Sequence, residues 1–205
     1  MKIAVVGSMN LDMIVHADRI PLKGETIKGD GLEYQPGGKG ANQAVAMAKL
    51  GADVAMFGCV GDDSAGRRLL ENLRVCGVSA DAVEMLKGVP TGQAIITAGG
   101  GDNTIVIIEG ANGYVNVDYV NRNREKILEA DLIVLQNEIT EAAIAYTLRM
   151  CSDAGRTILW NPAPARALDR DLVERVSYIT PNEHEVCLIW ETDESRVGSL
   201  MEQYP

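Results

Sequence analysis

Residues 54–77 read VAMFGCVGDDSAGRRLLENLRVCG, and this stretch decides the fold class. The apolar run over 54–59 predicts a buried strand, and the turn residues Gly61-Asp62-Asp63 end it. Apolar side chains then recur at the spacing of one buried helical face until Gly77, a helix stop signal. The stretch therefore predicts one strand followed by one amphipathic helix.

The same rhythm of strand and helix recurs along the chain. It predicts further strands over 2–7, 132–135, 157–160 and 178–180, and helices over 38–50, 140–151, 169–176 and after Pro181-Asn182. Repeated alternation specifies right-handed crossovers and a parallel sheet with helices on both faces. The predicted fold class is therefore α/β, a doubly wound parallel sheet.

Two segments, at about 11–35 and 92–109, break this rhythm. In the second, AIITA and TIVII flank the turn sequence GGGDN, a pattern typical of antiparallel strands. We interpret the two segments as a small β lid that projects over the ligand edge of the sheet; a peripheral β elaboration is the alternative. Because no linker divides the chain, we expect residues 1–205 to form one incomplete domain.

The composition limits the partners of the protein. A net charge of −10 over 205 residues opposes binding to nucleic acid or to an anionic membrane surface. Four cysteines without a CxxC pair indicate reduced thiols, and no apolar run is long enough to be a signal peptide or a membrane span. We therefore expect a cytoplasmic protein with no nucleic-acid or membrane partner.

The glycine-rich loop PGGKGANQA at 36–44 is the sharpest local signal. Its free N–H groups suit an oxygen-rich ligand, Lys39 can hold a hydroxyl or phosphate oxygen, and Asn42 can both donate and accept. A tight turn with close helix packing explains the same glycines. It is not a Walker loop, which would need glycine at Glu33 and serine or threonine at Gly40.

Polar side chains also follow two of the predicted strands. Asn10 and Asp12 come after the first strand, where ligands bind in parallel sheets, and could accept hydrogen bonds from vicinal hydroxyls. Glu138 follows the strand over 132–135. Taken alone, Asn-x-Asp is more often a turn or cap than a ligand site, and Glu138 either reaches the ligand or starts the next helix. The first turn lacks GxGxxG, which weakens a nicotinamide oxidoreductase.

Several motifs occur together in one order along the chain. They are Ser8-Met9-Asn10-Leu11-Asp12, GGKGANQA at 37–44, Gly58 through Gly61-Asp62-Asp63, and Thr180-Pro181-Asn182-Glu183-His184-Glu185. In this combination the chain resembles the ribokinase-like, PfkB-type family of carbohydrate kinases over nearly its whole length. The resemblance implies a ribokinase-like fold and ATP-dependent phosphorylation of the primary hydroxyl of D-ribose or a related sugar.

The resemblance also implies roles for individual residues. Those that match the sugar-binding positions of the family are Asn10, Asp12, Gly38, Lys39, Asn42 and Glu138. Asn182 and Glu185 match an Asn-x-x-Glu motif that organises magnesium and phosphate at the ATP site, Glu185 acting on the metal indirectly. Locally, the same pair predicts a helix N-cap and capping box, and both roles can coexist.

The chain departs from the family pattern after Glu185. The family takes its catalytic base from a Gly-Ala-Gly-Asp motif well beyond Asn-x-x-Glu, and this sequence has no match there. The look-alike Gly99–Asp102 lies between two predicted strands, where a hairpin turn explains it. We therefore expect a C-terminally truncated chain that lacks the catalytic base, most of the ATP site and the monovalent-cation loop, and is inactive alone.

Two further expectations concern assembly and function. The projecting strands could pair with those of a second subunit, which predicts a homodimer through the lid strands. The alternative to a kinase is a non-catalytic sugar-binding or dimerising protein derived from one.

Overall fold

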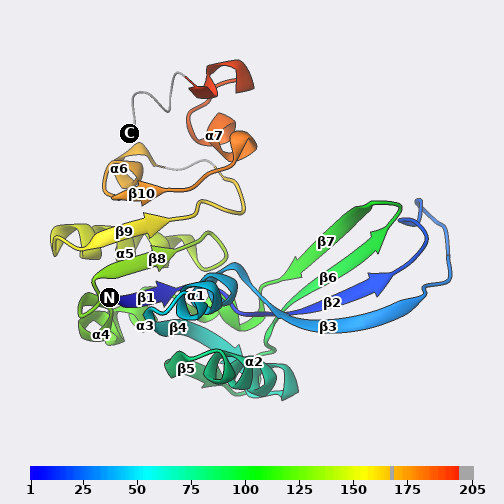
Figure 1. The fold of residues 1–205 in the computed structure, drawn as a ribbon, viewed down its shortest axis with the longest axis horizontal. Coiled ribbons are helices and arrows are strands. Elements are labelled where there is room, and N and C mark those ends of the chain that lie inside the picture. Colours follow the sequence, from blue (N-terminus) through cyan, green and yellow to red (C-terminus); the bar gives the residue numbers. More distant parts are fainter. Residues whose placement is uncertain (167–168, 199–205) are drawn as a thin grey trace.

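The computed structural model describes residues 1–166 and 169–198, and its centre is a parallel sheet of six strands (Figure 1). In spatial order the strands are β10 (Tyr178–Ile179), β9 (Thr157–Trp160), β8 (Leu132–Leu135), β1 (Lys2–Val6), β4 (Asp53–Gly61) and β5 (Val78–Leu86). All but β5 were predicted. In that edge strand exposed side chains, among them Asp81, interrupt the apolar pattern.

Helices cover both faces of the sheet. The side chains of each strand alternate between the two faces, so each face carries apolar side chains that must be buried. Ile3 and Val5 of β1 face α1 (Lys39–Lys49) and α2 (Ser64–Val75), which lie in front of the sheet in Figure 1. Ala4 and Val6 belong to the opposite core, with α3 (Val117–Arg122), α4 (Arg124–Leu128) and α5 (Glu141–Asp153). The predicted doubly wound α/β fold is confirmed.

The remaining helices are short. They are α6 (Arg170–Val173), α7 (Glu183–Ile189) and the 3-10 turns η1 (Gly110–Tyr114) and η2 (Glu194–Arg196). The helix predicted over 169–176, all of which the structure describes, is thus only a single turn. The Ser177 N–H bonds to the Ile158 carbonyl at 3.0 Å, so the chain must leave the helix to enter β10. Within residues 1–166 and 169–198, no helix has the length and apolar character needed to cross a membrane.

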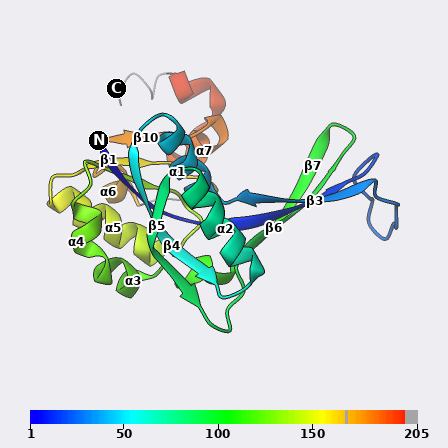
Figure 2. The ribbon, with the colours of Figure 1, turned by 60° about the horizontal axis from the view of Figure 1, so that its bottom comes forward.

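The lid is a separate four-stranded sheet that extends away from the body (Figures 1 and 2). Its order is β3 (Gly31–Gly37), β2 (Asn10–His16), β6 (Gly92–Gly99), β7 (Asp102–Ile108). The pairs β2–β3 and β6–β7 are antiparallel, as predicted. The central pair β2–β6 is parallel, which corrects the expectation of antiparallel strands throughout. Both strands leave the body at the same end, with Asn10 opposite Gly92, and therefore run outward together.

Candidate functional site

The order of the strands reverses around β1, which pairs with both β4 and β8. The chain builds outward from β1 to β5 on one side and later to β10 on the other. In open parallel sheets, ligands bind outside the carboxyl ends of the strands at such a reversal, because the loops there diverge and leave a crevice. The loops in question begin at Gly7 after β1 and at Gln136 after β8.

Glu138 is the meeting point of these loops and of α1. Its Oε2 atom accepts hydrogen bonds from the Ser8 hydroxyl at 2.6 Å and from the Lys39 N–H at 3.0 Å. Its Oε1 atom lies 4.0 Å from the Lys39 ammonium, and its side chain is only 8% exposed. One oxygen is therefore held by the protein, while the other faces a cation at the start of α1.

Asp12 adds a second carboxylate on the lid side of the same site. It packs over Gly37, where a Cβ atom would overlap the Asp12 carboxylate. Burial, and secondarily the negative charge of Glu138, raises the pKa of Asp12. The two carboxylates are thus near enough for their charges to interact, and both offer acceptors for hydroxyl groups.

Gly38 brings the glycine loop against the start of the lid. Its φ of 87° is one that L residues avoid, and a Cβ atom there would lie 2.7 Å from the backbone nitrogen of Asn10. Asn10 is almost fully buried, at 3% exposure. The loop glycine is therefore required both by its conformation and by the approach of the backbone to Asn10.

Asn42 is joined to another candidate through its backbone, because its N–H donates to the Gly38 carbonyl at 2.9 Å. Asn42 is exposed on the first turn of α1 and lines a cavity of about 200 Å³ between α1 and α2. None of the described hydrogen bonds joins its side chain to Asn10, Asp12 or Glu138. Its assignment to the sugar remains a prediction from resemblance.

Asn182 and Glu185 form the predicted capping box at the start of α7. The Asn182 side chain accepts from the Glu185 N–H, and the Glu185 Oε2 atom accepts from the Asn182 N–H, both at 2.8 Å. Over the described residues, no three His, Cys, Asp or Glu side chains form a cluster that could hold a metal ion. The Glu185 carboxylate is thus held in the capping box, which is compatible with the indirect action on magnesium that the resemblance implies.

Two other features lie away from this site. Asp102 pairs with Gly99 at the turn between β6 and β7, at the end of the lid remote from Asn10, as the hairpin interpretation predicted.

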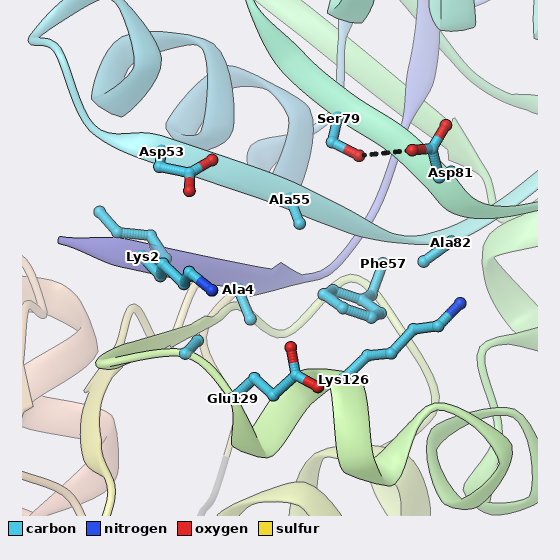
Figure 3. Close-up of a pocket in the computed structure, with 12 residues that line it drawn as sticks. Lys2, Ala4, Asp53, Ala55, Phe57, Ser79, Asp81, Ala82, Lys126 and Glu129 are labelled. Atoms are coloured by element: carbon cyan, nitrogen blue, oxygen red, sulfur yellow. Dashed lines mark hydrogen bonds between the residues drawn. The ribbon is translucent and has the colours of Figure 1, made fainter.

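A cavity of about 440 Å³ lies at the amino-terminal ends of the strands (Figure 3). It is lined by Lys2, Asp53 and Ser79 at strand starts, by Lys126 of α4 and by Glu129, which caps the carboxyl end of α4. That is the opposite end from where parallel sheets bind ligands.

Sequence reasoning missed two residues that touch the candidates, Ser8 and Asn112. Ser8 follows β1 almost directly, so its position at a strand end was a usable signal. Asn112 lies 102 residues from Asn10, whose side chain it contacts, and no local pattern predicts that contact.

The three layers, the projecting lid and the site at the strand reversal define the class of ribokinase-like α/β folds. The chain matches the model of the pfkB family carbohydrate kinases over residues 1–204, and it belongs to that family.

Its relatives agree with this assignment. A ribokinase of Bacillus subtilis (strain 168) is 39% identical over 204 residues, which is 100% of this chain and 69% of the relative. A ribokinase of Lactococcus lactis is 42% identical over 185 residues, 90% of this chain and 61% of the relative. The structure of Arabidopsis thaliana ribokinase complexed with ribose and ATP matches with a TM-score of 0.82 and 31% identity, over 90% of this chain and 61% of that one. The chain thus spans roughly three fifths to two thirds of these proteins.

Proposed function

We propose that the protein is a ribokinase-type sugar kinase that phosphorylates the primary hydroxyl of D-ribose or a related sugar with ATP. In this proposal the chain carries mainly the sugar-binding part. The observation that supports it best is the convergence of Asp12, Lys39 and Glu138 at the strand reversal. A chain of the pfkB family with a polar, acceptor-rich site at this place is suited to a polyol substrate.

The residues of the site would hold and orient the sugar. Carboxylate oxygens of Asp12 and Glu138 accept hydrogen bonds from sugar hydroxyls, while Lys39 donates to a sugar oxygen. The lid begins at Asn10 and Gly92, directly beside the site, so a closed lid would exclude water from the reacting hydroxyl. Phosphoryl transfer depends strongly on such positioning.

We propose ATP as the phosphoryl donor, with Asn182 and Glu185 at its site. ATP with magnesium would supply the transferred phosphoryl group and neutralise its charge. Because the Glu185 Oε2 atom already accepts from the Asn182 N–H in the capping box, Glu185 would act on magnesium indirectly. We assign no residue of this chain to the catalytic base or to a monovalent cation.

We also propose that the protein forms a homodimer through its lid strands. β3 and β7 are the two edges of the lid sheet, and edges with free N–H and C=O groups favour pairing with another chain. The apolar side chains of β7 between Ile105 and Ile108 are 42–62% exposed. Pairing of lids would cover this surface and join two sugar sites at one interface.

We also propose that the protein is cytoplasmic and has no nucleic-acid or membrane partner. The net charge of −10 opposes nucleic acid and anionic membranes as partners. All four cysteines are free, which suits a reducing cytoplasm.

The direct test is calorimetric binding of D-ribose, run beside ATP-dependent phosphorylation of D-ribose by the same sample of purified chain. We expect saturable binding that Asp12→Asn weakens and that Glu129→Gln leaves unchanged. Glu129→Gln is the matched control because it makes the same carboxylate-to-amide change in the cavity at the opposite end of the strands.

Three outcomes bear on the proposed function. Binding with turnover above the level of a host-kinase control supports a complete kinase, and it would contradict the expectation that the base is absent. Binding without turnover favours a chain that carries only the sugar site, which is also the behaviour of the non-catalytic alternative. Failure to bind ribose or a related sugar would overturn the proposed function.

A further inference from the structure

Asn112 places a buried amide against the start of the lid. It lies in η1, between β7 and α3, and is only 2% exposed. Its Oδ1 atom accepts from the Met9 N–H at 2.9 Å, and its Nδ2 group donates to the Met9 carbonyl at 3.3 Å and to Asn10 Oδ1 at 2.7 Å. The side chain therefore joins η1 to the loop after β1 through three hydrogen bonds.

The backbone of Met9 determines which way this amide faces. A backbone N–H can only donate and a carbonyl can only accept, so Asn112 must direct Oδ1 at the first and Nδ2 at the second. The atom of Asn10 that lies beside the Asn112 Nδ2 group must in turn be an acceptor, which makes it Oδ1. The orientation of the Asn10 amide thus follows from contacts with the main chain.

The consequence is that Asn10 turns its Nδ2 group away from Asn112. That group donates no hydrogen bond to the described residues, and it is not fully buried. Both of its hydrogens are therefore available to a ligand at the site where Asp12 and Glu138 supply acceptors.

Gly92 makes room for this pair of amides. A Cβ atom on Gly92 would overlap both the Asn112 Nδ2 and the Asn10 Oδ1 atoms. Gly92 also stands opposite Asn10 in the β2–β6 register. The first residue of β6 is therefore small where the amide pair crosses between the strands.

We propose that Asn112 is a positioning residue that fixes the donor side of Asn10 toward the sugar. This inference rests on the proposed sugar-binding function and extends it. With Asn10 fixed as a donor beside two carboxylate acceptors, the site distinguishes sugar oxygens that accept from hydroxyls that donate. Asn112 itself does not touch the sugar; it acts through Asn10.

The test uses two variants of Asn112 in the 205-residue chain. Asn112→Asp keeps the shape and the bond from the Met9 N–H but cannot donate to Asn10, so the Asn10 amide should rotate and give its Nδ2 group to the new carboxylate. Asn112→Ala removes the constraint without a buried charge, and it serves if the first variant folds poorly. We expect each to lower the D-ribose affinity at least 10-fold by calorimetry.

A purely structural role predicts different readouts. If Asn112 acts through Asn10, its substitution should cost little further affinity in an Asn10→Ala background, whereas independent effects would add. In side-chain amide NMR spectra, the Asn10 NH₂ protons should exchange with water more slowly in Asn112→Asp than in the unchanged chain. Asn116→Ala is the matched control, because Asn116 caps the neighbouring α3; it should lower stability and leave ribose affinity unchanged.

Each outcome bears on one claim. Unchanged affinity in both Asn112 variants would overturn the positioning role. So would a loss of affinity that is as large in the Asn10→Ala background as in the unchanged chain. In either case, ribose binding by the unchanged chain would still support the sugar site. Absence of ribose binding by the unchanged chain would overturn the proposed function, and the role of Asn112 with it.

Discussion

The Ser8 hydroxyl donates a 2.6 Å hydrogen bond to Glu138 Oε2, and this contact joins the loops that leave two adjacent strands, β1 and β8. The two residues are 130 positions apart in the sequence. Their strands are neighbours because the sheet reverses its order at β1. The contact therefore exists only once the parallel sheet has formed, and it couples the fold directly to the site.

Removing this hydrogen bond should affect both stability and binding. A hydrogen bond to a charged group contributes about 1.5–3 kcal/mol, so Ser8→Ala should lower the free energy of unfolding by roughly this amount and weaken D-ribose binding by up to about 10-fold. Urea unfolding and calorimetry measure the two effects. Ser79→Ala is the control, since Ser79 bonds to exposed Asp81 at 3.3 Å in the opposite cavity; equal effects from both variants would contradict this account.

Asp12 should make stability depend on pH in a defined direction. Burial and the charge of Glu138 raise its pKa in the folded state above the ordinary value of 3.8, so folding favours the protonated form. The contribution of Asp12 to stability is therefore fully present below pH 3.8, and it is lost as the pH rises through the pKa of the folded state. At pH 7 the charged group therefore opposes folding.

Asp12→Asn should consequently raise the free energy of unfolding at pH 7, and this gain should disappear as the pH falls below about 3.8. Urea unfolding across this pH range checks the prediction. A gain that grows toward low pH would reverse the sign and show that Asp12 is stabilised as the anion. The same variant should bind ribose more weakly, which separates its effect on stability from its role in the site.

Gly38 can be compared with Gly51, a glycine of similar conformation in open space. Their φ values are 87° and 92°, but only a Cβ atom on Gly38 meets other atoms within 4 Å. Gly51→Ala should cost about 1–2 kcal/mol through backbone strain alone. Gly38→Ala should cost more and should also abolish ribose binding, because it pushes against Asn10. Equal losses of stability in thermal unfolding, with binding retained, would show that the approach to Asn10 does not matter.

The exposed edge of the lid should mediate self-association. Val106 of β7 is 62% exposed, and Val106→Lys should convert a dimer to monomers without loss of fold, because a lysine on an edge strand opposes pairing. Sedimentation equilibrium measures the change. Leu50→Lys is the control, since Leu50 is 88% exposed at the end of α1, away from the lid. A monomeric unchanged chain would refute the proposed interface.

The sequence was informative where local pattern and tertiary structure agree. Apolar runs such as Ile3–Val6 predicted central strands because both of their faces are buried. β5 was not predicted because, as an edge strand, it mixes buried and exposed positions and carries charged side chains. The parallel β2–β6 pair could not be predicted, because it joins segments about 80 residues apart and much of the main domain, from α1 to β5, lies between them in the sequence.

The site divides in the same way. Asn10, Asp12 and Glu138 could be proposed because each follows a strand of the sheet or begins the lid. The bonds that orient them come from Ser8 and Asn112, over separations of 130 and 102 residues, and such contacts depend on topology rather than on neighbouring sequence. The role of Asn42 rests on the resemblance alone, and no described contact tests it.

The central claim is that a sugar binds where Asn10, Asp12, Lys39 and Glu138 converge, and an NMR titration of the labelled chain with D-ribose tests it most directly. We expect the largest shifts on the Lys39 backbone amide and the Asn10 side-chain amide. Ser79 and Lys126, at the opposite end of the strands, should stay unchanged. Shifts centred on Ser79 and Lys126, or none at Lys39 and Asn10 at saturating ribose, would contradict it.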